Sequence, residues 1–299
     1  MSRVLPAWRS VLYVPAHAPR FIASAHRRGA DAVQLDLEDS VPPAEKAAAR
    51  DGLRQAAATV AQAGADVLVR INRPLSLAVR DIEAAVCPQL KALTITKVDG
   101  ASHVRLFDEL VTECEAREGL PAGQVGFVLL VETVSAFLAM RELAEASPRV
   151  VALALGSEDF ALDAGMEAGD DTLLAPKQQM VLAARAAGVL PMGFIGSVAS
   201  LDDEEGFRAM VRRSRRFGFE VATCIHPRQV AIVNEEYGAQ PEALDWARRV
   251  VAENERRAAQ GQGAFRLDGR MVDRPIVERA QRLLARQAQW LSRPAPSAP

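Results

Sequence analysis

The chain has 299 residues, of which 49% are hydrophobic and 25% are charged, so its composition is that of a soluble globular protein with room for one large domain. The formal net charge of −2 excludes a general attraction to nucleic acid or to an anionic membrane, and we expect a small-molecule partner instead. With three widely spaced cysteines, no apolar leader and no run of roughly 20 apolar residues, the sequence predicts a cytoplasmic protein that does not enter the membrane.

Apolar runs, many rich in β-branched residues, alternate with segments of helical periodicity as far as Tyr237. In chain order the expected strands are residues 10–15, 31–37, 66–71, 92–97, 124–131, 150–156, 189–197 and 220–225. Many are apolar on both faces, which is typical of a parallel sheet covered by helices. Eight such units within 237 residues predict a closed (β/α)₈ TIM barrel, whereas a doubly wound open sheet, the alternative, usually has fewer strands.

The pattern changes after Tyr237. Residues 241–260 predict an amphipathic helix, residues 261–273 a short hairpin that turns at Asp268 and Gly269, and residues 274–291 a last helix. The remaining tail has no core-forming residues and is expected to be disordered. We therefore expect a barrel catalytic domain over residues 1–237 and a C-terminal helical extension with a hairpin and a disordered tail over residues 238–299.

Polar side chains follow the ends of several expected strands, where the βα loops of such a barrel carry function. They are Asp36, Glu38 and Asp39, then Arg70 and Asn72, Lys97, Glu132, Ser157 to Asp159, and His226. Charged groups that meet in one barrel mouth pay a desolvation penalty, so a ligand is expected among them. Carboxylates with few histidines suit Mg²⁺, and Glu132 and Asp159, on consecutive strands, are its predicted ligands.

Arg70 is the natural partner for a substrate carboxylate, because its planar fork binds both oxygens. This set of groups suits a 2-oxo acid as ligand, with its ketone and one carboxylate oxygen coordinating the metal. The metal would stabilise the enolate that forms when the neighbouring C–C bond breaks or forms. Other roles stay open: a structural ion pair for Arg70, capping of a helix near Pro42 by Glu38 and Asp39, and simple charge balance for Lys97.

Five segments of the chain resemble the citrate lyase β-subunit-like family of CoA-ester lyases, which belongs to the phosphoenolpyruvate/pyruvate barrel superfamily. They are residues 9–21, 29–50, 67–72, 131–165 and 224–234, and the DGRMVDRP segment is a weaker match. The resemblance implies Mg²⁺ on Glu132 and Asp159, a carboxylate on Arg70, and acids at Glu38 and Asp39 near metal-bound waters. It also implies a CoA-facing region, whose candidate residues are Arg9, Arg20, Lys46 and Arg50.

The resemblance implies a Mg²⁺-dependent carbon–carbon lyase that acts on citramalyl-, malyl- or citryl-CoA, in a homotrimer or hexamer. The chain departs from the family at Ala16, at Ala136, at Val221 and Ala222, and in the segment after the seventh strand, which lacks an early Asp. That last difference argues against synthase or thioesterase activity and leaves retro-aldol cleavage. The alternatives are a class II aldolase that acts on a free hydroxy-oxo acid and a non-catalytic metal- or CoA-binding regulatory protein.

Overall fold

The computed structural model describes residues 5–196, 203–259 and 263–292. They form two compact units, one that ends at Tyr237 and one that begins at Gly238, and each is described by itself. None of the helices in these ranges is both long and apolar enough to cross a membrane.

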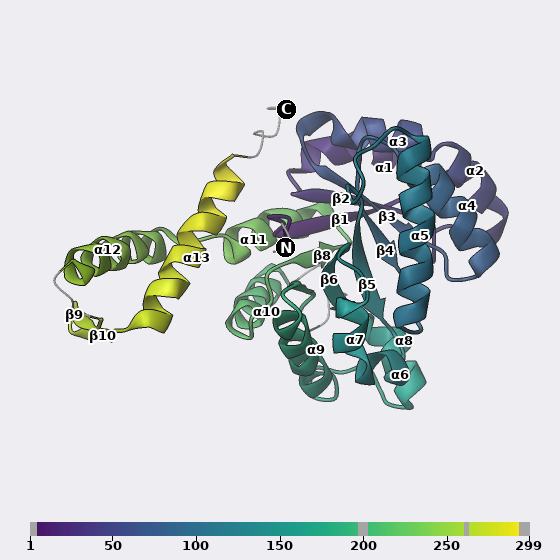
Figure 1. Ribbon diagram of the computed structural model, residues 1–299. Helices are drawn as coiled ribbons and strands as arrows, with labels where there is room; N and C mark the ends of the chain where they lie inside the picture. The colour runs from purple at the N-terminus through teal and green to yellow at the C-terminus, as the bar shows by residue number, and fades with distance from the viewer. Residues whose placement is uncertain (1–4, 197–202, 260–262, 293–299) are drawn as a thin grey trace. The chain divides into compact units, whose positions relative to one another are not determined.

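The first unit is built on a ring of parallel strands with helices around it (Figure 1). The strands are β1 (Ser10–Pro15), β2 (Ala32–Asp36), β3 (Asp66–Ile71), β4 (Leu90–Ile95), β5 (Gly126–Val131), β6 (Val150–Leu155), β7 (Leu190–Met192) and β8 (Ala222–Cys224). Their order in the sheet is β7-β6-β5-β4-β3-β2-β1-β8. A parallel bridge between Met192 and Val221 joins the two ends of this sheet. The structure therefore confirms the predicted (β/α)₈ barrel and all eight predicted strands.

The seventh strand is shorter than predicted, because the chain leaves the sheet at Gly193. Gly193 has a φ of 137°, and its amide donates to the carbonyl of Val221 at 2.8 Å. The last residue of the predicted strand, Ser197, lies outside the described residues.

The helices of this unit cover the outside of the barrel. They are α1 (Pro19–Ala25), α2 (Lys46–Asp51), α3 (Leu53–Val60), α4 (Leu75–Ala85), α5 (Ala101–Arg117), α6 (Val134–Leu138), α7 (Met140–Glu145), α8 (Ser157–Ala164), α9 (Leu174–Ala186), α10 (Glu204–Arg216) and α11 (Pro227–Tyr237). Short 3₁₀ turns are η1 (His26–Arg28), η2 (Pro43–Glu45) and η3 (Ala61–Ala63). In α5 the buried side chains include Val104, Phe107, Val111 and Cys114, whose spacing of three and four residues places them on one face.

Two hydrophobic clusters follow from the alternation of side chains along the strands. The larger one lies between the strands and the helices, and the smaller one fills the inside of the ring. The inner cluster contains Trp8, Val11, Ala32, Leu68, Ala92 and Val128. Trp8, just before β1, is fully buried and donates from Nε1 to Asp66 Oδ2 at 2.6 Å. The barrel is thus packed at its amino end, and its inward polar residues lie at the carboxyl end.

The second unit contains two helices and a hairpin: α12 (Pro241–Ala258), β9 (Phe265–Leu267), β10 (Arg270–Val272) and α13 (Arg274–Leu291). The strands are antiparallel and turn at Asp268 and Gly269, which both have positive φ, as a tight hairpin turn requires. Val250, Phe265 and Val277 belong to its own small core. Beyond Ser292, the tail predicted to be disordered lies outside the described residues.

Candidate active site

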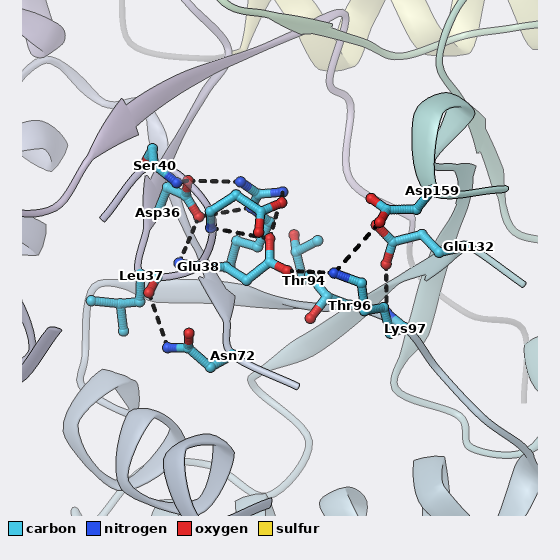
Figure 2. A network of polar contacts seen from close by, with 12 residues as sticks. Asp36, Leu37, Glu38, Ser40, Asn72, Thr94, Thr96, Lys97, Glu132 and Asp159 are labelled. Atoms are coloured by element: carbon cyan, nitrogen blue, oxygen red, sulfur yellow. Dashed lines mark hydrogen bonds and ion pairs between the residues drawn. The ribbon is translucent and has the colours of Figure 1, made fainter. Parts of the chain in front are cut away.

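A cavity of about 730 Å³ opens at the carboxyl ends of the barrel strands. Its polar lining includes Tyr13, Asp36, Asp39, Arg70, Glu132, Glu158, Asp159 and Lys177. Strand register explains part of this arrangement, because Asp36 of β2 is paired with Arg70 of β3, and Tyr13 lies on β1, the other neighbour of β2. The predicted mouth residues Glu38 and Lys97 join them through a network of polar contacts (Figure 2).

Asp36 and Arg70 form the base of one side of the site. They are paired in the register of β2 and β3, and Nε and Nη2 of Arg70 each donate to one carboxylate oxygen of Asp36 at 2.7 Å. Burial alone would raise the pKa of Asp36, but the hydrogen bonds and charge of Arg70 leave that pKa below its ordinary value. The guanidinium is therefore held along one edge, with Nη1 turned toward Glu38.

Glu38 lies between two cations. One of its carboxylate oxygens accepts from Nη1 of Arg70 at 2.9 Å, and the other is 3.2 Å from Nζ of Lys97. Burial, assisted by the negative charge of Asp39, raises the pKa of Glu38. Asp39 is 62% exposed and its carboxylate is 3.7 Å from Arg70 Nη1. Neither acid caps a helix near Pro42, because η2 has no side-chain capping hydrogen bond.

Glu132 and Asp159 occupy the other side of the site. Glu132 directly follows β5, and Asp159 lies in the first turn of α8. Glu132 accepts a 2.5 Å hydrogen bond from the backbone amide of Lys97, while Nζ of Lys97 is 3.7 Å from Asp159. Burial raises the pKa of Glu132 to about 7, and the charges of Asp159 and Glu38 add to that rise against the hydrogen bond from Lys97.

Gly156 makes room for the Glu132 side chain. A Cβ on Gly156 would lie 2.5 Å from Cγ and 2.9 Å from Oε1 of Glu132, closer than real Cβ atoms approach other atoms. The φ of Gly156 is −78°, so glycine is required here for space and not for backbone conformation. The sequence places this small residue directly before the helix that carries Asp159, and the two carboxylates can lie on one side of the mouth.

The acids of this side could hold a hard cation. Two carboxylates lie here, and one of them is buried and therefore hard to ionise alone. A divalent cation would stabilise the ionised form of both. In the described part of the chain there is no group of three or more His, Cys, Asp and Glu side chains suited to a metal. Two carboxylates are enough for Mg²⁺, which completes its octahedron with waters and substrate oxygens. The residues therefore fit Mg²⁺ better than a transition metal.

Two cations expected to face CoA are instead used inside the protein. Nζ of Lys46 donates to the carbonyls of Leu37 and Glu38 and to Oδ1 of Asn72, at 2.7 to 2.8 Å. Arg50 donates to Asp81 at 2.7 Å. Lys46 thereby holds the loop that carries Glu38 and Asp39, and its three hydrogens are all used in these bonds, whereas Arg50 is bound to Asp81 in α4.

The remaining two cations lie at opposite ends of the barrel. Arg9 precedes β1 and pairs with Asp31, which precedes β2, so it lies at the amino end and away from the cavity. This corrects the expectation that Arg9 faces the site: residues just before a strand lie at the end opposite to residues just after it. Arg20, in the first turn of α1, is exposed, and its side chain has no partner among the described residues.

Sequence reasoning missed three features of the site. Asp36 was one of several acids at the end of the second strand, with no stated partner, although Arg70 lies at the end of the neighbouring third strand and the two positions were a usable signal. The role of Lys97 in linking both sides of the mouth depends on an unusual backbone, with a φ of 46°. Lys177, in α9, gave no sequence signal because it lies within a helical pattern.

Comparisons with known proteins agree with this architecture. A sequence model described as HpcH/HpaI aldolase/citrate lyase matches residues 9–227. The citrate lyase subunit beta of Leuconostoc mesenteroides subsp. cremoris is 32% identical over 279 residues, which cover 92% of each chain. An L-malyl-CoA/beta-methylmalyl-CoA lyase of Cereibacter sphaeroides is 33% identical over 307 residues and 95% of each chain.

A solved structure of similar fold is the protein CitE from Mycobacterium tuberculosis in complex with magnesium, acetoacetate and coenzyme A. It has a TM-score of 0.73 and 32% sequence identity, and the match covers 93% of this chain and 97% of that one. Citrate lyase beta subunit from the same organism, complexed with oxaloacetate and magnesium, has a TM-score of 0.62, 29% identity and coverage of 77% and 96%.

Proposed function

This chain belongs to the HpcH/HpaI aldolase/citrate lyase family, and we propose that it is a Mg²⁺-dependent carbon–carbon lyase that cleaves the CoA thioester of a short hydroxy-dicarboxylic acid. The observation that supports this most is the pair of carboxylates, Glu132 and Asp159, in the same cavity as a guanidinium that Asp36 holds rigidly. The relatives named for citrate lyase and malyl-CoA lyase activities make carbon–carbon cleavage of a CoA thioester the leading reaction.

We assign Glu132 and Asp159 to the metal. Gly156 leaves space for Glu132 to reach its position, and the backbone amide of Lys97 orients one of its oxygens. When bound, Mg²⁺ would polarise the oxygens of the keto acid half and stabilise the negative charge that develops there. Burial is the main cause of the raised pKa of Glu132, and the negative charges of Asp159 and Glu38 add to it; a bound cation would offset both effects.

Arg70 would orient the carboxylate of the substrate. Its Nε and Nη2 edge is taken by Asp36, so the guanidinium cannot rotate, and the Nη1 side faces the cavity beside Glu38. A guanidinium fixed in advance loses little conformational freedom on binding, which favours recognition of a carboxylate of defined orientation.

Glu38 and Asp39 would handle the proton. In the cleavage direction the substrate hydroxyl loses its proton, and the bond between the hydroxyl-bearing carbon and the thioester α-carbon breaks. The electron pair passes into the thioester enolate, which then takes up a proton to give the acyl-CoA and the keto acid. A carboxylate whose pKa is raised by burial, as that of Glu38 is, accepts and returns a proton more readily near neutral pH.

The CoA moiety would meet fewer cations than the sequence predicts. Arg20 is available near the mouth, whereas Lys46 holds the loop, Arg50 is paired with Asp81, and Arg9 lies at the other end of the barrel. This observation favours a second candidate, a class II aldolase that acts on a free hydroxy-oxo acid. We also expect a cytoplasmic protein that assembles as a homotrimer or hexamer, and light scattering on the purified protein would check the oligomeric state.

The decisive experiment offers citramalyl-, malyl- and citryl-CoA, together with a free hydroxy-oxo acid, to the purified protein with Mg²⁺. Release of a keto acid from one thioester supports the lyase, while release from the free acid alone supports the aldolase. No release from any substrate, with unchanged thermal stability on addition of CoA, would overturn the lyase proposal. A Glu132→Ala variant should lose both metal binding and turnover; turnover that survives would contradict the metal assignment.

A further inference from the structure

Lys177 is a buried cation in the wall of the cavity that the reaction described above does not use. It lies in α9, is only 5% exposed, and lines the cavity. Its Nζ donates to the carbonyls of Ile195 at 3.2 Å and Gly196 at 2.9 Å. An ammonium has three hydrogens, so one of them has no acceptor among the described residues.

The charge of Lys177 is not neutralised by an acid within ion-pair distance in the described ranges. Arg70 has Asp36 at 2.7 Å and Lys97 has Glu38 at 3.2 Å, whereas the two partners of Lys177 are neutral carbonyls. Carbonyl dipoles satisfy N–H groups but cannot supply an opposite charge. A buried and unpaired charge is costly, which is why such groups usually meet a ligand of opposite sign.

Nearby acids act on Lys177 only from a distance. Burial lowers the pKa of its ammonium, and the charges of Asp170 and Glu158 raise it, but neither carboxylate pairs with it. The chain after β7 runs through Gly193, Phe194, Ile195 and Gly196, which bring backbone and apolar groups to this wall. A side chain that could neutralise Lys177 is therefore missing from the described part of this loop.

The position of Lys177 indicates where in the cavity an anionic group of a ligand would bind. Lys177 lies between β6 and β7, and β7 stands four places from β3 in the ring of eight strands, opposite Arg70. The metal-side carboxylates follow β5 and β6, on the arc between them. Besides Glu158 and Asp170, which also line the cavity, the lining includes the apolar side chains of Leu173, Met180, Met192, Phe194 and Phe219.

We propose that Lys177 binds a second carboxylate of the substrate. The part of the substrate that is released as the keto acid would then carry two carboxylates. One carboxylate and the ketone lie toward Arg70 and the metal side, and the other carboxylate reaches the ammonium across the cavity. This inference rests on the proposed function and narrows it, because it favours citryl-CoA, which yields oxaloacetate, over the thioesters that yield pyruvate or glyoxylate.

The test compares two keto acids that differ by one carboxylate. Calorimetric titration with freshly prepared oxaloacetate and with pyruvate, both with Mg²⁺, should show oxaloacetate binding at least about tenfold more tightly, the scale of one hydrogen bond to a charged group. Lys177→Met should lose this preference while its affinity for pyruvate stays unchanged, and Lys177→Arg should keep part of it. Lys91→Met, at an exposed lysine on β4, is the matched control and should behave like the unaltered protein.

Equal affinities for the two keto acids in the unaltered protein would overturn the proposal, and this measurement needs no variant to fold. Equal losses of both affinities in Lys177→Met would also overturn it, because they would show a structural role. If Lys177→Met does not fold, a preference that Lys177→Arg retains supports the proposal, and a preference that Lys91→Met loses contradicts it. A preference that persists in a protein that cleaves none of the thioesters would refute the proposed function and leave the role of Lys177 standing.

Discussion

Asp36 and Arg70 are paired in the register of two neighbouring strands, and their side chains close a bidentate ion pair inside the barrel with both N–O distances at 2.7 Å. Strand geometry therefore fixes the direction of the guanidinium before any ligand arrives. The pair also ties the loop after β2 to the site, because the backbone amides of Glu38 and Ser40 donate to the Asp36 carboxylate.

Replacing Asp36 by Asn should damage both stability and binding. The substitution removes the negative charge that neutralises the buried guanidinium of Arg70. Removing one partner of a buried ion pair lowers the free energy of unfolding by about 3–5 kcal/mol. We expect a lower urea midpoint and a KM for the thioester substrate raised at least tenfold. Asp31→Asn, which breaks the Arg9 pair at the amino end, is the control: it should lower stability and leave KM unchanged.

Replacing Gly156 by Ala should weaken metal binding without unfolding the protein. The new Cβ would meet Glu132 Cγ at 2.5 Å, so the carboxylate must move, while a φ of −78° suits alanine. We expect the Mg²⁺ dissociation constant from calorimetry to rise at least tenfold with a similar thermal midpoint. At Gly100 nothing lies within 4 Å of an added Cβ, so Gly100→Ala should retain the affinity; equal affinity in both variants would contradict the assigned role of Gly156.

Metal binding should depend on pH through Glu132. Its pKa in the folded chain is about 7, above the ordinary value of 4.5, so between these values the folded chain holds a proton that the unfolded chain has released. The corresponding stability of the metal-free protein is full below about pH 4.5 and is lost as the pH rises through about 7, by roughly 3 kcal/mol.

Because Mg²⁺ requires the ionised carboxylate, its binding should release close to one proton at pH 6 and almost none at pH 8.5. Calorimetry in buffers of different ionisation enthalpy measures this number directly. Proton release that is the same at both pH values would show that Glu132 is not the titrating ligand. Glu132→Gln, which has no carboxyl group to titrate, should flatten the stability profile of the metal-free protein.

Two substitutions at Lys97 should separate its backbone role from its ammonium. A φ of 46° is strained for any residue with a Cβ and is relaxed for glycine. Lys97→Ala and Lys97→Gly both remove the ammonium between Glu38 and Asp159, but we expect the glycine variant to be more stable by about 1 kcal/mol. Chemical denaturation measures the difference, and a more stable alanine variant would show that this backbone is not strained.

The strands could be predicted because each is a continuous apolar run, as buried parallel strands require, and position after a strand predicted which residues gather at the mouth. What the sequence could not show is which cation meets which acid. The sequence places Lys46 and Arg50 in a helical segment, where they look like cations that face solvent. In the structure Lys46 donates to the carbonyl of Glu38, and Arg50 pairs with Asp81. Such pairings depend on distances between segments far apart in the chain. The hydrogen bond from the backbone amide of Lys97 to the carboxylate of Glu132 similarly depends on a backbone conformation that residue type does not predict.

The packed amino end of the barrel, with Trp8 at its base, has a kinetic consequence. A reaction chamber that is sealed at its base is filled and emptied through the same opening. In the proposed reaction the acyl-CoA product would extend toward that opening, so it should depart first, and the keto acid beside Glu132 second. Steady-state inhibition follows from this order: the keto acid should compete with the substrate for the free enzyme, whereas the acyl-CoA should inhibit non-competitively.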